Sequence, residues 1–178
     1  MRTYNDTRSL GDAGKHLVME YFRQCGYTVT DLTDIPGYTK MNVDFSIEFQ
    51  GQKRHVCVRT DTRLCTSKNI VLETLICRRG THSLIPGWFF TCQAEILAYL
   101  DAYTGDLFLL DWAWLKELAA HNTVGNRREF RNPVDYNSQG QVHLISLDEL
   151  RACPAFKGED KIDVHTLAKY NWERPVPF

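Results

Sequence analysis

Residues 43–61, VDFSIEFQGQKRHVCVRTD, contain two runs in which apolar and polar residues alternate, separated by Gly51 and Gln52. Such alternation is typical of β-strands with one buried face. Glycine in the short connection is typical of a hairpin turn. We therefore expect strands at residues 43–50 and 54–60 that pair as an antiparallel hairpin.

The second of these strands carries a row of chemically distinctive side chains. Because side chains two positions apart on a strand face the same side, Cys57, Arg59 and, at the end of the strand, Asp61 should share one face. A twisted hairpin can bring Asp44 beside that face. The sequence therefore predicts a polar site built on the hairpin.

Further elements flank the hairpin. Residues 12–25 place apolar side chains at helical spacing and are followed by Gly26, a typical helix C-cap, after which residues 26–30 lead into an extended segment. The other expected elements are a strand at 70–76, a helix-like run at 93–99 that continues as a strand, a short strand at 107–110, a helix at 112–121 capped by Asp111, a loop at 122–141, a strand at 142–145 and a helix capped by Ser146.

Length and composition predict one ordinary globular domain. The 178 residues, 43% of them hydrophobic and 24% charged, contain no repeat and no linker. We expect a core over about residues 10–115 and a C-terminal extension over 122–178 that holds the final strand and helix. No apolar stretch is long enough to span a membrane, and the start has no signal-peptide pattern, so a cytoplasmic location is expected.

The six cysteines have no C-x-x-C spacing, and most of them lie in apolar runs. This spacing argues against a zinc site, and the expected compartment argues against structural disulfides. We expect reduced and mostly buried thiols.

Positive charge is concentrated locally although the net charge is −1. Residues 52–80 hold seven basic residues against two acidic ones, a local balance of +5, and more arginines follow near residue 130. Such clustering is typical of a face that meets phosphates, although a solvated surface is an equal alternative. The candidate nucleic-acid contacts are Arg54, Arg63, Lys68, Arg78, Arg79, Arg127 and Arg128.

The order of these elements resembles the PD-(D/E)xK nuclease superfamily, particularly its small phage and prophage members and the Holliday-junction resolvase-like group. The resemblance rests on Gly14…Glu20…Gly26-Tyr27, Asn42-Val43-Asp44-Phe45, Val56-Cys57-Val58-Arg59-Thr60-Asp61, Asn69-Ile70-Val71-Leu72-Glu73 and Tyr99-Leu100-Asp101. It implies an α/β fold with a restriction-endonuclease-like core, in which a central mixed β-sheet is flanked by helices in α-β-β-β-α-β order.

The resemblance also implies a site for Mg²⁺ or Mn²⁺. Asp44 matches the first acid of the family, and the carbonyl of Val58 matches its backbone metal ligand. Arg59 stands where the family has lysine, and Cys57 stands where it has the second acid. A thiol is a poor Mg²⁺ ligand, and arginine stabilises phosphate charge but cannot give up a proton as a tuned lysine can.

Three other acids could replace the missing carboxylate. Glu73 could act as a metal ligand from a neighbouring strand, and Asp61 or Glu20 could supplement it. The alternative for each acid is an ordinary surface role, such as an exposed ion pair that contributes little to stability.

Two main hypotheses follow from the resemblance. One is a metal-dependent nuclease that acts on nucleic acid, with DNA favoured and RNA as the lesser alternative. The other is a catalytically inactive protein of the same fold that binds nucleic acid or a nucleic-acid-handling protein; one form is a phage-encoded anti-defence protein (anti-CRISPR or anti-restriction) that meets a bacterial defence system. A dimer is compatible with either, and a plain structural partner is a third alternative.

Overall fold

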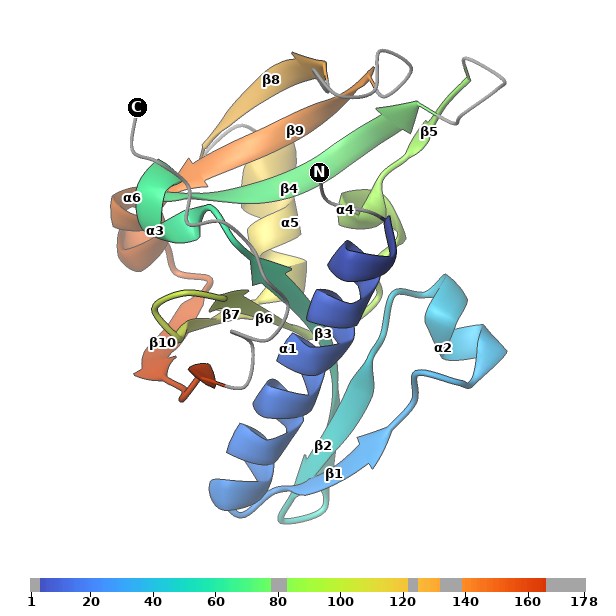
Figure 1. Cartoon of the computed structure of the whole chain (residues 1–178), viewed down its shortest axis with the longest axis vertical. Helices are drawn as coiled ribbons and strands as arrows, with labels where there is room; N and C mark the ends of the chain where they lie inside the picture. The colour runs from blue at the N-terminus through green and yellow to red at the C-terminus, as the bar shows by residue number, and fades with distance from the viewer. Residues whose placement is uncertain (1–3, 78–82, 122–124, 132–138, 166–178) are drawn as a thin grey trace.

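The computed structural model describes residues 4–77, 83–121, 125–131 and 139–165. They form a mixed α/β structure with two β-sheets and flanking helices (Figure 1). The expected fold class, a central mixed sheet flanked by helices, is confirmed. No described helix is both long and apolar enough to span a membrane.

The larger sheet, sheet A, contains the predicted hairpin. Its strands run antiparallel to their neighbours except for the third and fourth, which are parallel. In spatial order they are β1 (Thr28–Asp31), β2 (Phe45–Phe49), β3 (Gln52–Asp61), β6 (Ile96–Asp101), β7 (Asp106–Asp111) and β10 (Phe156–Lys161).

The smaller sheet, sheet B, is antiparallel throughout and lies at the other end of the molecule from the β2–β3 turn (Figure 1). Its order is β5 (Leu84–Pro86), β4 (Asn69–Cys77), β9 (Gln139–Ser146) and β8 (Asn126–Arg131). The helices are α1 (Tyr4–Gln24), α2 (Pro36–Lys40), α3 (Leu64–Ser67), α4 (Trp88–Thr91), α5 (Trp112–Ala120) and α6 (Leu147–Ala152).

The two faces of β3 belong to different hydrophobic cores. Val56 and Val58 pack with α1, through residues such as Val18 and Phe22. Cys57 belongs to the core formed with α5 and sheet B. Figure 1 shows α1 lying across β2 and β3, on the side of sheet A where Val56 and Val58 are packed. Alternation along one strand therefore separates a packing face from the face that carries Arg59.

Helix α1 approaches β3 closely at Gly14. A β-carbon placed on Gly14 would lie 2.0 Å from the hydroxyl oxygen of Thr60, far inside van der Waals contact. Only glycine leaves the space for the helix to pack at this distance. The helix begins earlier than the sequence pattern indicated, at Tyr4 instead of Asp12.

The predicted caps are confirmed at two helices. The Asp111 carboxylate accepts a hydrogen bond from the backbone N–H of Trp114 at 3.1 Å, at the start of α5. Ser146 and Glu149 form a reciprocal capping box at the start of α6. Each cap accepts hydrogen bonds from backbone N–H groups that have no partner within the first turn of the helix.

The expected order places the strand at 70–76 third in the same sheet as the hairpin, and this position is wrong. The three consecutive antiparallel strands of sheet A are β1, β2 and β3, while the strand predicted at 70–76 is β4 of sheet B and pairs with β5 and β9. Both edges of β3 are occupied, by β2 and by β6, so β4 has no edge there to join. Lys68, with a φ of 54°, ends α3 and directs the chain into sheet B.

Three other expectations also need correction. Residues 93–95 do not form the expected helix-like run, whereas the strand expected to continue it is present as β6 at 96–101; a short helix, α4, lies earlier. The expected loop at 122–141 contains β8, and β10 was not predicted. The sequence of β10, FKGEDK, has no alternation of apolar and polar residues, so nothing in its pattern indicates a strand.

Candidate functional site

Asp44 lies directly before β2 and beside the centre of β3. Its backbone N–H donates to the carbonyl of Val56 at 2.9 Å, which continues the hairpin ladder by one residue. Its Oδ2 accepts a hydrogen bond from the backbone N–H of Val58 at 2.7 Å. The structure thus places Asp44 beside the second strand, as the twisted hairpin predicted.

Burial raises the pKa of the Asp44 carboxyl above its ordinary value, because the charged form is poorly solvated. The Val58 N–H, the Arg59 guanidinium and the Lys15 ammonium act in the opposite direction. Asp44 is therefore a half-buried acid held between two basic side chains.

Arg59 is the centre of the polar side of β3. Its Nη1 donates to the carbonyl of Val58 at 2.8 Å, and its Nη2 donates to Oδ1 of Asn42 at 3.2 Å. Its guanidinium carbon lies 4.5 Å from the centre of the Trp88 ring, a cation–π contact. Backbone, amide and aromatic contacts together fix the guanidinium in one position.

The charge of Arg59 is maintained by its neighbours. Burial disfavours the charged guanidinium, but nearby groups raise the pKa of Arg59 above its ordinary value. These groups include Asp44 and Glu73, so both predicted metal-binding acids lie within electrostatic reach of the same guanidinium.

The site residues do not fit a divalent metal ion. The carbonyl of Val58, the expected backbone ligand, already accepts the guanidinium of Arg59. A permanent cation there would repel a metal ion. Within the described part of the chain, no three His, Cys, Asp or Glu side chains are grouped so that they could hold a metal. The positive charge of Arg59 lowers the pKa of both the Asp44 and the Glu73 carboxyls, against the effect of burial.

Glu73 was predicted to lie on a strand next to β3. It lies instead on β4 of sheet B, which pairs with β9. Burial raises the pKa of its carboxyl, and Arg59 lowers it. Gly87, at the start of α4, packs so closely against β4 that a β-carbon would lie 2.2 Å from the carbonyl oxygen of Glu73. This close approach seats α4 on β4, and Trp88 of α4 in turn contacts Arg59.

Asp61 holds Tyr99, whose hydroxyl links the two sheets. Its Oδ2 accepts from the hydroxyl of Tyr99 at 2.7 Å, and its Oδ1 accepts from the backbone N–H of Arg63 at 2.7 Å. The same Tyr99 hydroxyl oxygen accepts from the backbone N–H of Val71 in β4 at 3.1 Å. Both carboxylate oxygens of Asp61 are thus engaged in structural hydrogen bonds.

Glu20 lies apart from this site. It is exposed on α1, on the opposite side of sheet A from Cys57, and forms an ion pair with Arg23 at 3.1 Å.

Lys15 is the basic residue that sequence reasoning missed. It is only 6% exposed, pairs with Asp12 at 3.4 Å and lies within electrostatic reach of Asp44. Its position could have been found, because Lys15 falls at helical spacing with Val18, Met19 and Phe22 on the buried stripe of α1. A lysine on such a stripe requires an anionic neighbour.

Cys57 and Cys92 form a buried thiol pair beside Arg59. Both are 0% exposed and lie in the same hydrophobic core. The neighbouring Cys92 thiol and burial raise the pKa of Cys57, and the neighbouring Cys57 thiol lowers the pKa of Cys92. The second cysteine comes from the turn after α4, far from Cys57 in sequence, so spacing rules could not reveal the pair.

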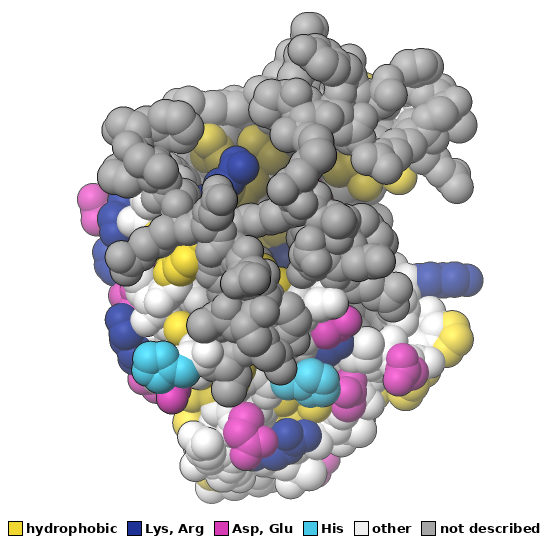
Figure 2. Space-filling view, viewed as in Figure 1, with side chains coloured by type: hydrophobic (Ala, Val, Ile, Leu, Met, Phe, Trp, Pro, Cys, Tyr) yellow, Lys and Arg dark blue, Asp and Glu magenta, His cyan; other side chains and the backbone are white. Residues whose placement is uncertain are grey.

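The structure places the side chains of three predicted nucleic-acid contacts, Arg54, Arg63 and Lys68. Arg54 is exposed near the start of β3, and Arg63 is exposed just beyond its end, where α3 begins. Lys68 is exposed at the end of α3, near Arg63. Figure 2 shows basic, acidic and histidine side chains intermixed over the lower part of this face.

The remaining predicted contacts cannot be placed by their side chains. Arg78 and Arg79 lie outside the described residues. For Arg127 and Arg128 the structure describes only the backbone of β8, where they pair with His143 and Val142. Their part in a nucleic-acid interface stays a prediction.

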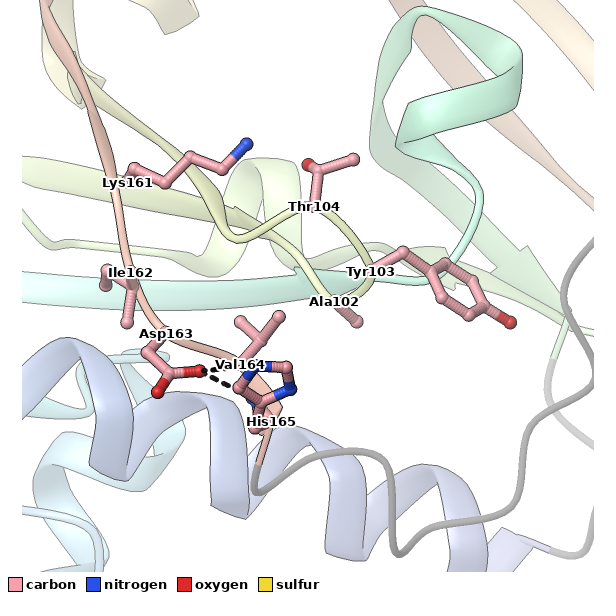
Figure 3. Close-up of a pocket in the computed structure, with 8 residues that line it drawn as sticks. All are labelled: Ala102, Tyr103, Thr104, Lys161, Ile162, Asp163, Val164 and His165. Carbon is pink, nitrogen blue, oxygen red and sulfur yellow. Dashed lines mark hydrogen bonds and ion pairs between the residues drawn. The ribbon is translucent and has the colours of Figure 1, made fainter.

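An open cavity of about 600 Å³ lies between the turn after β6 and the segment after β10 (Figure 3). The imidazole of His165 and the carboxylate of Asp163, 4.0 Å apart, line it together with Tyr103, Thr104 and Lys161. None of the predicted site residues lines this cavity, so it is separate from the Arg59 site.

No family model and no curated protein matches the chain. Among solved structures, the chain is similar to a bacterial homing endonuclease, I-Ssp6803I, with 12% sequence identity and a TM-score of 0.49 over 62% of this chain and 72% of the other. A likeness at this level assigns neither an activity nor a substrate to this chain.

Proposed function

We propose that this chain is a nuclease-fold protein of the PD-(D/E)xK type that binds nucleic acid without cutting it. The observation that carries the proposal is the position of Arg59, whose guanidinium bonds the Val58 carbonyl at 2.8 Å beside Asp44. The element order supports the fold part of the proposal, because a β1-β2-β3 meander follows α1 and β6 returns parallel to β3.

Chemistry argues against cleavage at this site. Hydrolysis of a phosphodiester in such a site needs a divalent ion that holds water and stabilises the leaving oxygen. Cys57 is a soft, buried thiol where a hard oxygen ligand is required. Arg59 stays protonated and cannot activate water. A fixed guanidinium can nevertheless balance the two acids and keep the site folded.

Exposed cations at both ends of β3 support binding to an extended polyanion. Lys53 and Arg54 lie near the β2–β3 turn, and Arg63 and Lys68 lie at α3. Two groups of cations at opposite ends of β3 can meet phosphates separated along a duplex, which favours DNA as the ligand.

Binding and cleavage can be tested together on supercoiled plasmid, single-stranded DNA and RNA. We expect binding whose affinity falls steeply with salt, and no cleavage in the presence of Mg²⁺ or Mn²⁺. The double variant Arg63→Gln/Lys68→Gln should reduce the slope of log affinity against log salt by roughly 0.9 for each lost phosphate contact. The charge-matched control Arg23→Gln/Lys40→Gln, on α1 and α2, should leave the slope unchanged.

Two outcomes would overturn the proposal. Metal-dependent cleavage that disappears in Asp44→Ala would establish a nuclease. Absence of any binding to nucleic acid would instead favour a protein partner, such as a component of a defence system.

A further inference from the structure

We propose that Phe49, with Arg54 beside it at the β2–β3 turn, is a stacking platform for an unpaired base of the bound nucleic acid. The inference rests on the proposed nucleic-acid binding and names the kind of ligand, one that carries unpaired nucleotides where it meets this turn. Phe49 ends β2 and is 47% exposed, although Phe45 and Ile47 on the same face of the strand are buried in the core with α1.

An aromatic row fixes the position of the Phe49 ring. Its centre lies 5.3 Å from that of Tyr27, whose own ring packs edge-on, at 5.5 Å, against the buried Phe22 of α1. The two residues of the turn, 50–51, both have a positive φ, of 51° and 76°. Two such residues are typical of a tight hairpin turn that matches the twist of its strands. The ring is therefore anchored on one side and is carried by a short turn.

A basic side chain accompanies the ring on the same face. Arg54 of β3 lies directly opposite Ile47 of β2, and residues opposite each other in an antiparallel pair point to the same side. Because Phe49 is two residues from Ile47, the exposed Arg54 is its diagonal neighbour. Lys53, opposite Glu48, lies on the other face. A ring beside a guanidinium complements a nucleotide, since the base stacks on the ring and the phosphate meets the cation.

The chemistry of stacking selects the ligand. Each base inside a duplex is already stacked between its neighbours, whereas an unpaired base has a π-face free for an aromatic side chain. Exposure of a ring alone does not make such a platform. Phe90 is 50% exposed, but the four residues of its helix α4 include no basic one, so Phe90 provides a matched control.

Two DNA probes of identical charge test the inference by fluorescence anisotropy. One is a duplex with a short single-stranded extension, and the other is the same duplex with abasic sites throughout its extension. The abasic sites keep the phosphates and delete the bases. We expect the wild type to bind the first probe about 5- to 150-fold more tightly than the second, the range that stacking of one base on an aromatic ring supplies.

Three variants sharpen the assignment. Phe49→Ala should bind both probes equally, and its slope of log affinity against log salt should match that of the wild type, because the ring carries no charge. Phe49→Trp keeps an aromatic face and should keep the preference for the first probe. Phe90→Ala should behave as the wild type does.

The outcomes separate this inference from the proposed function. If the wild type binds both probes equally, or if Phe49→Ala keeps the preference, the inference is overturned and nucleic-acid binding stands. Absence of binding to either probe overturns both proposals. If Phe49→Ala dissociates a dimer in sedimentation and leaves DNA affinity unchanged, the ring belongs to an interface between two copies of the chain, and the inference is again overturned.

Discussion

The two faces of β3 show how one strand can serve two purposes. Toward α1 it presents Val56 and Val58, which pack in an apolar core with Phe45 and Phe22. Toward α5 and sheet B it presents Cys57 and Arg59, which lie among acids, thiols and tryptophans. The first face depends on shape and burial, because its groups carry no charge. The second depends on each polar group finding a partner, because an unpaired buried charge is costly.

The apolar face should show the largest effect of a single substitution. Phe45 is fully buried against α1, so Phe45→Ala leaves a cavity and should lower the free energy of unfolding by about 3–5 kcal/mol. Phe49→Ala on the same strand is the matched control. Phe49 is 47% exposed, so its replacement should lower the free energy of unfolding much less. Urea unfolding of both variants measures the difference. Equal losses would show that the α1 face is not the tightly packed one.

A second substitution tests the same face by adding volume. Gly14→Ala forces a methyl group against Thr60 and should cost about 1–3 kcal/mol in the free energy of unfolding. Gly11→Ala meets nothing within 4 Å on the same helix, so it should be neutral or stabilise the helix by about 0.5–1 kcal/mol. Thermal unfolding of the pair measures the contrast, and a stabilised Gly14→Ala would contradict the close approach of α1 to β3.

The polar face is tested by removing one partner. Asp44→Ala leaves the Val58 N–H without its acceptor and should cost about 1–3 kcal/mol in the free energy of unfolding. Asp34→Ala, an exposed aspartate in the loop before α2, is the control and should change stability little. If both variants unfold at the same urea concentration, the hydrogen bond from Val58 contributes nothing to stability.

The smallest expected effect is a pH dependence at Glu73. Because burial raises the pKa of this carboxyl in the folded protein, the folded state holds the proton more tightly than the unfolded chain does. The stabilisation that comes from this tighter proton binding is complete below the pKa of Glu73 in the unfolded chain. It is lost as the pH rises through the pKa of Glu73 in the folded protein. Relative to wild type, Glu73→Gln should therefore gain stability as the pH rises from about 4 to 7.

Unfolding midpoints at a series of pH values measure this gain. Glu20→Gln, which alters an exposed ion pair on α1, is the control and should show no such trend. A loss of stability in Glu73→Gln at neutral pH would mean that the Arg59 contact outweighs burial.

The sequence predicted the parts of the fold that local pattern controls. The β2–β3 hairpin, the shared face of Cys57 and Arg59, and the caps at Asp111 and Ser146 all follow from spacing and side-chain chemistry. These features depend on residues close together in the chain.

The remaining features depend on contacts between distant segments. The pairing of β4 with β9 required knowing that both edges of β3 were taken, which no local pattern reveals. Cys57 and Cys92, which are far apart in sequence, lie in the same hydrophobic core. The direction of the Arg59 side chain, onto its own strand's carbonyl, is likewise a product of the folded environment.

The central claim is that Arg59 takes the place of a divalent ion beside Asp44, and Mn²⁺ binding tests it most directly. Electron paramagnetic resonance can follow a Mn²⁺ titration of the full chain, of Asp44→Ala and of Cys57→Asp/Arg59→Lys, which restores a hard acid and a lysine. We predict no binding that depends on Asp44 in the wild type, and a new site in the double variant. A wild-type Mn²⁺ site that disappears in Asp44→Ala would contradict the claim.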